Sequence, residues 1–227
     1  MEKSITHEVK TYYDLSIPNA GAEMPLLIAT HGYGGDKGSM ARLAKRVDGG
    51  RFVIASLQGM HQHFKALGSP RTHKQDVGFG WLSPWKPEES KSIHHDSVSF
   101  IIDTLAKDGT IDPTKVFMIG FSQSVSLNLR FALTYPGMIS GIVGICGGIP
   151  FDLESNPIYN KGGVDAFYLH MSRDEFYTPK QVDENVEKLR PFVKSLTVAR
   201  LEGGHTISHE MFPLVESWLS ERLDSAL

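Results

Sequence analysis

Short apolar segments rich in β-branched residues alternate along the chain with segments of helical periodicity, and this alternation constrains the fold more than any other feature. Each apolar segment is nearly continuous, which is typical of a strand buried on both faces of a parallel sheet. The strand candidates are residues 25–31, 51–57, 115–120, 140–146, 166–171 and 195–201. The helix candidates are residues 38–47, 92–107, 123–133, 180–194 and 208–223. The order predicts an α/β fold with a mostly parallel, twisted sheet and helices on both faces.

Two further segments refine this prediction. Residues 8–17 alternate polar and apolar side chains, which indicates an antiparallel strand at one edge of the sheet. Residues 58–90 have no clear period and hold three Pro, four Gly and two Trp. Loops of this length in a compact domain are typically functional or disordered, and the aromatic residues of this one favour a packed functional loop: Phe64, Phe79, Trp81 and Trp85. We therefore expect one domain over 1–227, with residues 58–90 as a functional loop over the active site.

Composition excludes several classes of function. The chain has 23 basic and 26 acidic side chains, a net charge of −3, and no basic cluster of the kind that binds nucleic acid. No apolar run approaches the roughly 18 residues that a membrane-spanning helix needs. The first residues lack the apolar core of a signal peptide, and the single Cys146 cannot close an intrachain disulfide. These features predict a cytoplasmic protein.

Residues 120–124 carry the strongest chemical signal. They read Gly-Phe-Ser-Gln-Ser and lie directly between a strand candidate and a helix candidate. A nucleophilic serine at such a turn normally reads G-x-S-x-G, because the crowded backbone needs small neighbours; here Ser124 takes the place of the second glycine. The pentapeptide alone leaves two interpretations of Ser122 open, a catalytic nucleophile or a helix N-cap.

Two polar turns after the last two strand candidates support the catalytic interpretation. A serine hydroxyl needs a general base, and the base needs a carboxylate that orients it. Asp174 follows the strand candidate 166–171, and His205 follows the strand candidate 195–201. The order Ser, acid, His, each after a strand, is the order of the α/β-hydrolase triad. The pattern therefore favours Ser122, Asp174 and His205 as a catalytic triad.

A glycine-rich turn supplies the fourth element. Residues 31–35, His-Gly-Tyr-Gly-Gly, lie at the end of the strand candidate 25–31. Acyl transfer builds an oxyanion that needs preorganised N–H donors, and such a turn offers them together with the residue after the nucleophile, Gln123. A phosphate-binding loop is disfavoured, because the turn matches neither G-x-G-x-x-G nor a Walker motif.

From about residue 25 onward the chain resembles the phospholipase/carboxylesterase branch of the α/β-hydrolase superfamily, which includes acyl-protein thioesterases. The segments HGYGGDKGS, GFSQS, YLHMSRDEFYTP and GGHT carry the resemblance. It implies that Ser122 is the nucleophile, Asp174 the acid and His205 the base, with the N–H groups of Tyr33 and Gln123 as the oxyanion hole. Three departures stand out: Ser124 for glycine, His170-Met171 before the acid, and a proline that comes one residue late. The last departure keeps Glu175 as an alternative acid.

The expected function is that of a serine esterase, which hydrolyses small to medium carboxylic esters through an acyl-enzyme. A thioesterase, a lysophospholipase or a non-catalytic binding protein on the same scaffold are the alternatives. The aromatic residues of the loop predict an apolar substrate pocket, with Trp81 as its main wall and Phe64 and Trp85 beside it. The competing interpretation is that they anchor the loop. No cofactor, metal or nucleic acid is expected.

Overall fold

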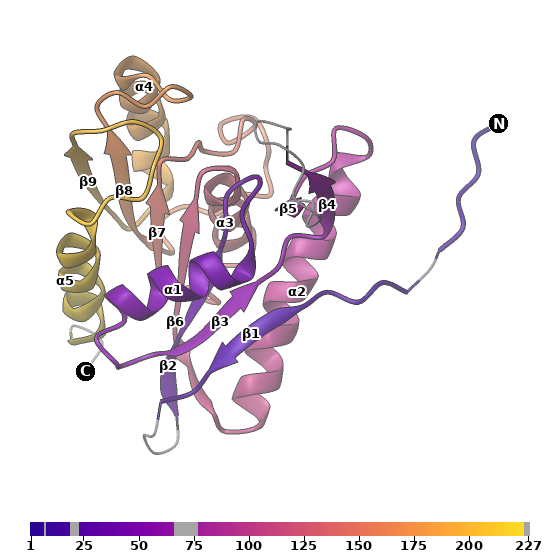
Figure 1. Ribbon diagram of the computed structural model, residues 1–227, viewed down its shortest axis with the longest axis horizontal. Coiled ribbons are helices and arrows are strands. Elements are labelled where there is room, and N and C mark those ends of the chain that lie inside the picture. The colour runs from indigo at the N-terminus through magenta and orange to yellow at the C-terminus, as the bar shows by residue number, and fades with distance from the viewer. Residues whose placement is uncertain (7, 19–22, 66–76, 225–227) are drawn as a thin grey trace, which may run out of the picture.

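A seven-stranded sheet forms the centre of the computed structural model, which describes residues 1–6, 8–18, 23–65 and 77–224 (Figure 1). Its strand order is β1-β3-β2-β6-β7-β8-β9. The strands are β1 (Tyr13–Ser16), β2 (Met24–Thr30), β3 (Val53–Leu57), β6 (Ile111–Phe121), β7 (Gly141–Ile145), β8 (Asp165–Met171) and β9 (Ser195–Leu201). All neighbours are parallel except β1, which pairs antiparallel with β3 at the edge. The predicted α/β fold and its antiparallel edge strand are confirmed.

Helices cover both faces of this sheet. One face carries α1 (Lys37–Val47) and α5 (Met211–Asp224), which contact each other. The other carries α2 (Pro87–Lys107), α3 (Gln123–Thr134) and α4 (Pro179–Leu189). Successive residues of a strand point to opposite faces, so Leu26 enters one core and Leu27 the other. This double burial explains why the central strands are continuously apolar in sequence.

Several boundaries differ from the sequence prediction, and one hairpin was not predicted. Helix α2 starts at Pro87, before the expected residue 92, because proline suits the first position of a helix. Helix α4 ends at Leu189 and a 3₁₀ turn, η1 (Arg190–Phe192), follows, since Pro191 has no N–H for a helical bond. The segment 58–90 holds an unexpected hairpin, β4 (His61–Phe64) with β5 (Val77–Gly80). The part of this segment between them, 66–76, lies outside the described residues.

The parallel order brings five strand ends to one edge of the sheet. The carboxyl ends of β2, β6, β7, β8 and β9 lie side by side, and the turns that follow them hold the residues singled out by the sequence. Ligands of open α/β sheets bind outside this edge. The topology therefore gathers residues from distant parts of the chain into one region.

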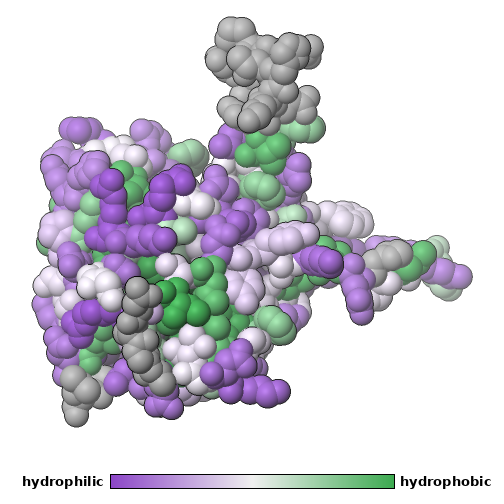
Figure 2. Space-filling view, turned by 60° about the horizontal axis from the view of Figure 1, so that its bottom comes forward, coloured by the Kyte–Doolittle hydropathy of each residue, from purple (hydrophilic) through white to green (hydrophobic). Residues whose placement is uncertain are grey.

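The N-terminal residues lie outside this region. They extend away from the body of the molecule, and Figure 2 shows them as a projection beyond its surface. They expose Ile5, Val9 and Tyr12, while Glu2 pairs with Lys86 at 2.9 Å. Among the described residues no helix combines the length and the apolar character needed to cross a bilayer.

Candidate active site

Ser122 occupies a strained turn between β6 and α3. Its backbone has φ 55° and ψ −116°, values that residues other than glycine rarely adopt. Its N–H donates to the Ile145 carbonyl at 2.8 Å. Close packing maintains this conformation: a Cβ at Gly120 would lie 2.7 Å from Asn128 Nδ2, and one at Gly147 would lie 2.6 Å from the Ser122 carbonyl oxygen. The Ser122 hydroxyl caps no helix N–H. The side chain is therefore free for another partner.

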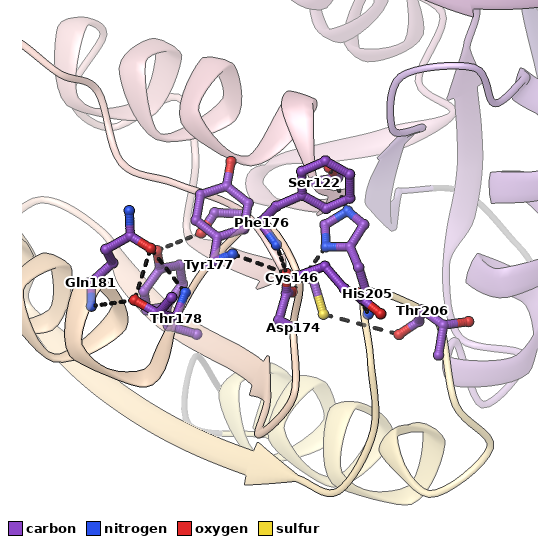
Figure 3. Close-up of polar contacts among 12 residues, drawn as sticks. Ser122, Cys146, Asp174, Phe176, Tyr177, Thr178, Gln181, His205 and Thr206 are labelled. Carbon is purple, nitrogen blue, oxygen red and sulfur yellow. Dashed lines mark hydrogen bonds and ion pairs between the residues drawn. The ribbon is translucent and has the colours of Figure 1, made fainter.

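That partner is His205, in the turn after β9. The His205 Nε2 atom lies 2.8 Å from Ser122 Oγ, and His205 Nδ1 lies 2.9 Å from Asp174 Oδ2 (Figure 3). The His205 side chain is 13% exposed and the Asp174 side chain is fully buried. The three residues predicted from their order in sequence thus form one hydrogen-bonded chain from the hydroxyl to the buried carboxylate.

The turn after β8 holds Asp174 in its charged form. Its second oxygen, Oδ1, accepts backbone N–H bonds from Phe176 at 2.8 Å and Tyr177 at 3.0 Å. Burial acts to raise the pKa of the Asp174 carboxyl, but the bonds from His205, Phe176 and Tyr177 outweigh it and lower the pKa. Because a carboxylate only accepts, His205 Nδ1 carries the proton and Nε2 is left to accept from Ser122.

The neighbouring Glu175 has a different position. Its Oε2 atom accepts the backbone N–H of His205 at 2.8 Å, and that bond lowers the pKa of its carboxyl. Glu175 thus contacts the main chain of His205, whereas Asp174 contacts the imidazole. The alternative acid suggested by the late proline is therefore not in contact with the ring.

Two aromatic side chains flank the imidazole. The ring centroid of Phe121 lies 5.0 Å from that of His205, and the ring of Phe176 lies 4.7 Å away at an interplanar angle of 65°. Phe176 is 69% exposed, so it covers the histidine from the solvent side. The sequence analysis did not single out either residue, although their places next to Ser122 and Asp174 offered a signal.

Cys146 lies behind the acid, at the end of β7. Its Sγ atom and ligand atoms of Asp174 and His205 all lie within 4.8 Å of one another, so this trio could be considered for a metal. Burial and the adjacent Asp174 raise the pKa of the Cys146 thiol to about 12. The thiol is therefore protonated, and His205 and Asp174 already bond each other. The arrangement fits a triad better than a metal centre.

The turn after β2 presents N–H donors beside Ser122. Among the described residues, neither the Tyr33 N–H nor the Gln123 N–H has a protein acceptor. Gln123 is the first residue of α3, where the helix dipole favours negative charge. Strand β5 fixes the turn, because the Gly34 N–H donates to the Phe79 carbonyl at 2.8 Å. The two free donors are suited to an oxyanion.

The structure gives the three aromatic residues of the loop different positions. Trp81, expected as the main pocket wall, is only 4% exposed. Its indole packs against His31 and donates to the His31 carbonyl at 2.7 Å, while its backbone N–H donates to Gln123 Oε1 at 2.8 Å. Trp81 thus supports the glycine-rich turn 31–35, because its indole N–H donates to the carbonyl of the first residue of that turn. Phe64 and Trp85 are 66% and 72% exposed.

A groove of about 400 Å³ lies beside the triad. Tyr177 lines the groove, and its ring centroid is 6.2 Å from that of His205, so this side chain lies between the groove and the triad. Most of its remaining walls come from the segment after β7 and from α4, and many are polar. They include Ser126, Gly148, Phe151, Glu154, Gln181, Glu184, Asn185 and Lys188. This groove was not predicted from the sequence, because its lining comes from three separate segments: α3, the residues after β7, and α4.

Comparison with known families matches nearly the whole chain. A family profile described as phospholipase/carboxylesterase matches residues 16–223. The carboxylesterase SOBER1 of Arabidopsis thaliana is 29% identical over 151 residues, which cover 60% of this chain and 58% of that protein. A SOBER1-like protein of the same plant is 30% identical over 160 residues, or 64% of this chain and 57% of the relative. The chain thus spans less than three fifths of the length of both relatives.

Solved structures share the fold. The carboxylesterase from Mesorhizobium loti superimposes with a TM-score of 0.71 at 20% identity, covering 92% of this chain and 94% of that one. Acyl-protein thioesterase 2 of Zea mays gives a TM-score of 0.68 at 16% identity, covering 94% of this chain and 100% of the other. At these identities the likeness establishes the architecture alone.

Proposed function

Since this chain belongs to the phospholipase/carboxylesterase family of α/β hydrolases, we propose that it is a serine esterase that cleaves small to medium carboxylic esters. Its catalytic residues in this proposal are Ser122, His205 and Asp174. The observation that carries the proposal is the pair of bonds from His205, 2.8 Å to Ser122 Oγ and 2.9 Å to Asp174 Oδ2. The strained backbone of Ser122 and its lack of a capping bond argue against the helix-cap interpretation.

The reaction begins with attack of Ser122 Oγ on the ester carbonyl carbon. His205 Nε2 takes the hydroxyl proton as the new C–O bond forms, and the carbonyl oxygen becomes an oxyanion between the N–H groups of Tyr33 and Gln123. The tetrahedral intermediate then collapses, His205 returns the proton to the departing alkoxide, and an acyl-enzyme remains. A water molecule, deprotonated by His205, then attacks the acyl carbon; the bond to Ser122 Oγ breaks, His205 returns the proton to Oγ, and the carboxylic acid is released.

Asp174 orients and stabilises the base throughout. Its carboxylate accepts the Nδ1 proton, which fixes the tautomer of His205 and stabilises the imidazolium that forms in both steps. The N–H groups of Phe176 and Tyr177 keep the carboxylate charged and aimed at the ring. Asp174 itself does not take the proton.

The substrate is proposed to lie along the carboxyl edge of the sheet. The exposed rings of Tyr33 and Phe176 flank this edge, and the groove beside Tyr177 gives room for one arm of an ester. Phe64 and Trp85 remain predicted contacts at the rim of the loop. A cytoplasmic location also remains a prediction.

The test is hydrolysis of p-nitrophenyl esters of graded acyl length, with an acyl-CoA thioester and a lysophospholipid alongside. Ser122→Ala should remove at least about a thousandfold of kcat/KM on the preferred substrate, because the base loses its nucleophile. Ser140→Ala is the matched control, since its hydroxyl donates to the Thr114 carbonyl at the opposite end of β7. Preference for the thioester or the lysophospholipid would redefine the substrate while keeping the triad.

A non-catalytic binding protein on this scaffold gives a different result. It would hydrolyse none of the substrates, and Ser122→Ala would match wild type in every assay. Detectable hydrolysis that survives Ser122→Ala would equally reject the proposal.

A further inference from the structure

Ser124 stands where the elbow motif normally has its second glycine, and its hydroxyl is fully buried. The Ser124 Oγ atom donates to the Thr30 carbonyl at 2.9 Å and lies 3.1 Å from the Phe121 carbonyl oxygen of its own turn. Thr30 is the last residue of β2, and the turn that carries the Tyr33 N–H begins one residue later. The bond therefore joins the helix that carries one proposed oxyanion donor to the strand that leads to the other.

The same two elements are joined by a second buried contact. The Thr30 hydroxyl accepts from Asn128 Nδ2 at 2.8 Å and donates to the Ile119 carbonyl at 3.3 Å. The Asn128 side-chain oxygen in turn lies 3.2 Å from His94 Nε2 of α2. Thr30, Ser124 and Asn128 are fully buried and His94 is 2% exposed. A buried polar network of this kind is strengthened by the low local dielectric and holds its members in one arrangement.

We propose that Ser124 is a positioning residue for catalysis: its bond to Thr30 fixes the distance between the Tyr33 and Gln123 N–H groups. Oxyanion donors act because they are preorganised, and a displacement of about 1 Å can cost about a hundredfold in rate. Without the hydroxyl, α3 loses one of its two hydrogen bonds to Thr30, the one nearest to Gln123, and keeps only the bond from Asn128. The inference rests on the proposed esterase function, because it concerns the same two donors.

The test compares Ser124→Ala with wild type on the preferred ester. We expect kcat to fall about tenfold while KM stays within about twofold, because the donors act on the transition state and not on the bound ester. A trifluoromethyl ketone, which adds to the nucleophile and places an oxyanion between the donors, should lose affinity by the same factor. A merely structural role would not move this inhibitor constant.

Ser56→Ala is the matched control. The Ser56 hydroxyl is also fully buried and also donates to a backbone carbonyl, that of Lys37 at 2.7 Å, but it ties β3 to α1. Both variants should lower Tm by a few degrees, as expected for the loss of one buried hydrogen bond. Only Ser124→Ala should change kcat and the inhibitor constant.

Equal kcat and equal ketone affinity for Ser124→Ala and Ser56→Ala would overturn the inference. Should Ser124→Ala fail to fold, Ser124→Gly gives the second test, with the same expected losses in kcat and ketone affinity. Failure of the esterase proposal gives a different result: wild type and Ser122→Ala either both hydrolyse the ester fully or both fail to hydrolyse it. The two failures are therefore distinguishable.

Discussion

The turns after β6, β8 and β9 and the described parts of the long segment 58–90, residues 58–65 and 77–90, meet at the same edge of the sheet, yet they are built differently. Each turn is short and places one chemically distinctive side chain: Ser122, Asp174 or His205. The long segment contributes backbone and buried contacts, since Phe79 pairs with the oxyanion turn and Trp81 supports it. In the proposed mechanism the turns therefore hold the reacting groups, and the described part of the segment holds the turn after β2 in place.

The largest effect is expected in the catalytic turns, where two adjacent carboxylates can be separated. Asp174→Asn should lower kcat/KM by about 10³–10⁴-fold, because an amide cannot hold the His205 tautomer. Glu175→Gln should cost less than about tenfold, since its oxygen contacts only the His205 backbone N–H. Steady-state kinetics on one ester checks the pair. A larger loss for Glu175→Gln would mean that the acid is misassigned.

Substitutions of Trp81 and Trp85 test whether the segment 58–90 supports the turn after β2 or lines the substrate pocket. Trp81→Ala should lower the free energy of unfolding by about 3–5 kcal/mol, as expected for a buried indole, and should reduce kcat/KM by a similar factor for every acyl length. Trp85→Ala, at an exposed position, should stay within about 0.5 kcal/mol of wild type. Urea denaturation and the ester panel provide both readouts.

A selective change in acyl preference for Trp81→Ala, without loss of stability, would restore the pocket wall predicted from the sequence. That outcome would require the indole to leave its partner, the His31 carbonyl, when substrate binds. It would also remove the distinction between the turns and the long segment.

The smallest predicted effect is a pH dependence of the free energy of unfolding, which arises from His94 beside Trp81. His94 packs edge-on against the Trp81 ring at 5.3 Å, and burial lowers its pKa to about 3. The unfolded chain binds a proton near pH 6.5, so it holds more protons than the folded protein between about pH 6.5 and 3. Stability should therefore fall as the pH drops below 6.5, by up to about 1.4 kcal/mol per pH unit from this group. The Asp174 pKa is shifted down, so its contribution is lost only below the ordinary aspartate range.

His94→Gln checks this assignment, because glutamine keeps an amide donor near Asn128 but does not titrate. Denaturation at pH 7, 6 and 5 should show a shallower decline for the variant than for wild type. Identical slopes would show that His94 does not contribute to the acid sensitivity.

The sequence predicted the order of strands and helices along the chain, and it singled out the three residues that the structure joins by hydrogen bonds, for a clear reason. Each triad residue follows a strongly patterned strand, and parallel strands bring their ends together regardless of separation in sequence. Trp81 could not be assigned in this way, because its burial depends on a carbonyl of His31, which lies 50 residues away along the chain. The choice of Asp174 over Glu175 likewise needed the geometry of the turn, since both residues are carboxylates in adjacent positions.

The hairpin of β4 and β5 and the role of Ser124 were also beyond the sequence. Strands of four residues show too little alternation to be recognised, and their pairing is not local. In the sequence, Ser124 only weakens the match to the G-x-S-x-G motif. Its proposed positioning role follows from the hydrogen bond of its hydroxyl to the Thr30 carbonyl. The role of a small polar residue in a crowded turn depends on its hydrogen-bond partner, which the local sequence pattern does not reveal.

The central claim is that Ser122 is the nucleophile of the site. The most direct measurement is covalent labelling with a fluorophosphonate, followed by intact mass and peptide mapping. Wild type should gain one phosphonyl group, mapped to Ser122, and Ser122→Ala should gain none. A label on Cys146, whose thiol is buried and protonated, or a label that persists in Ser122→Ala would contradict the account.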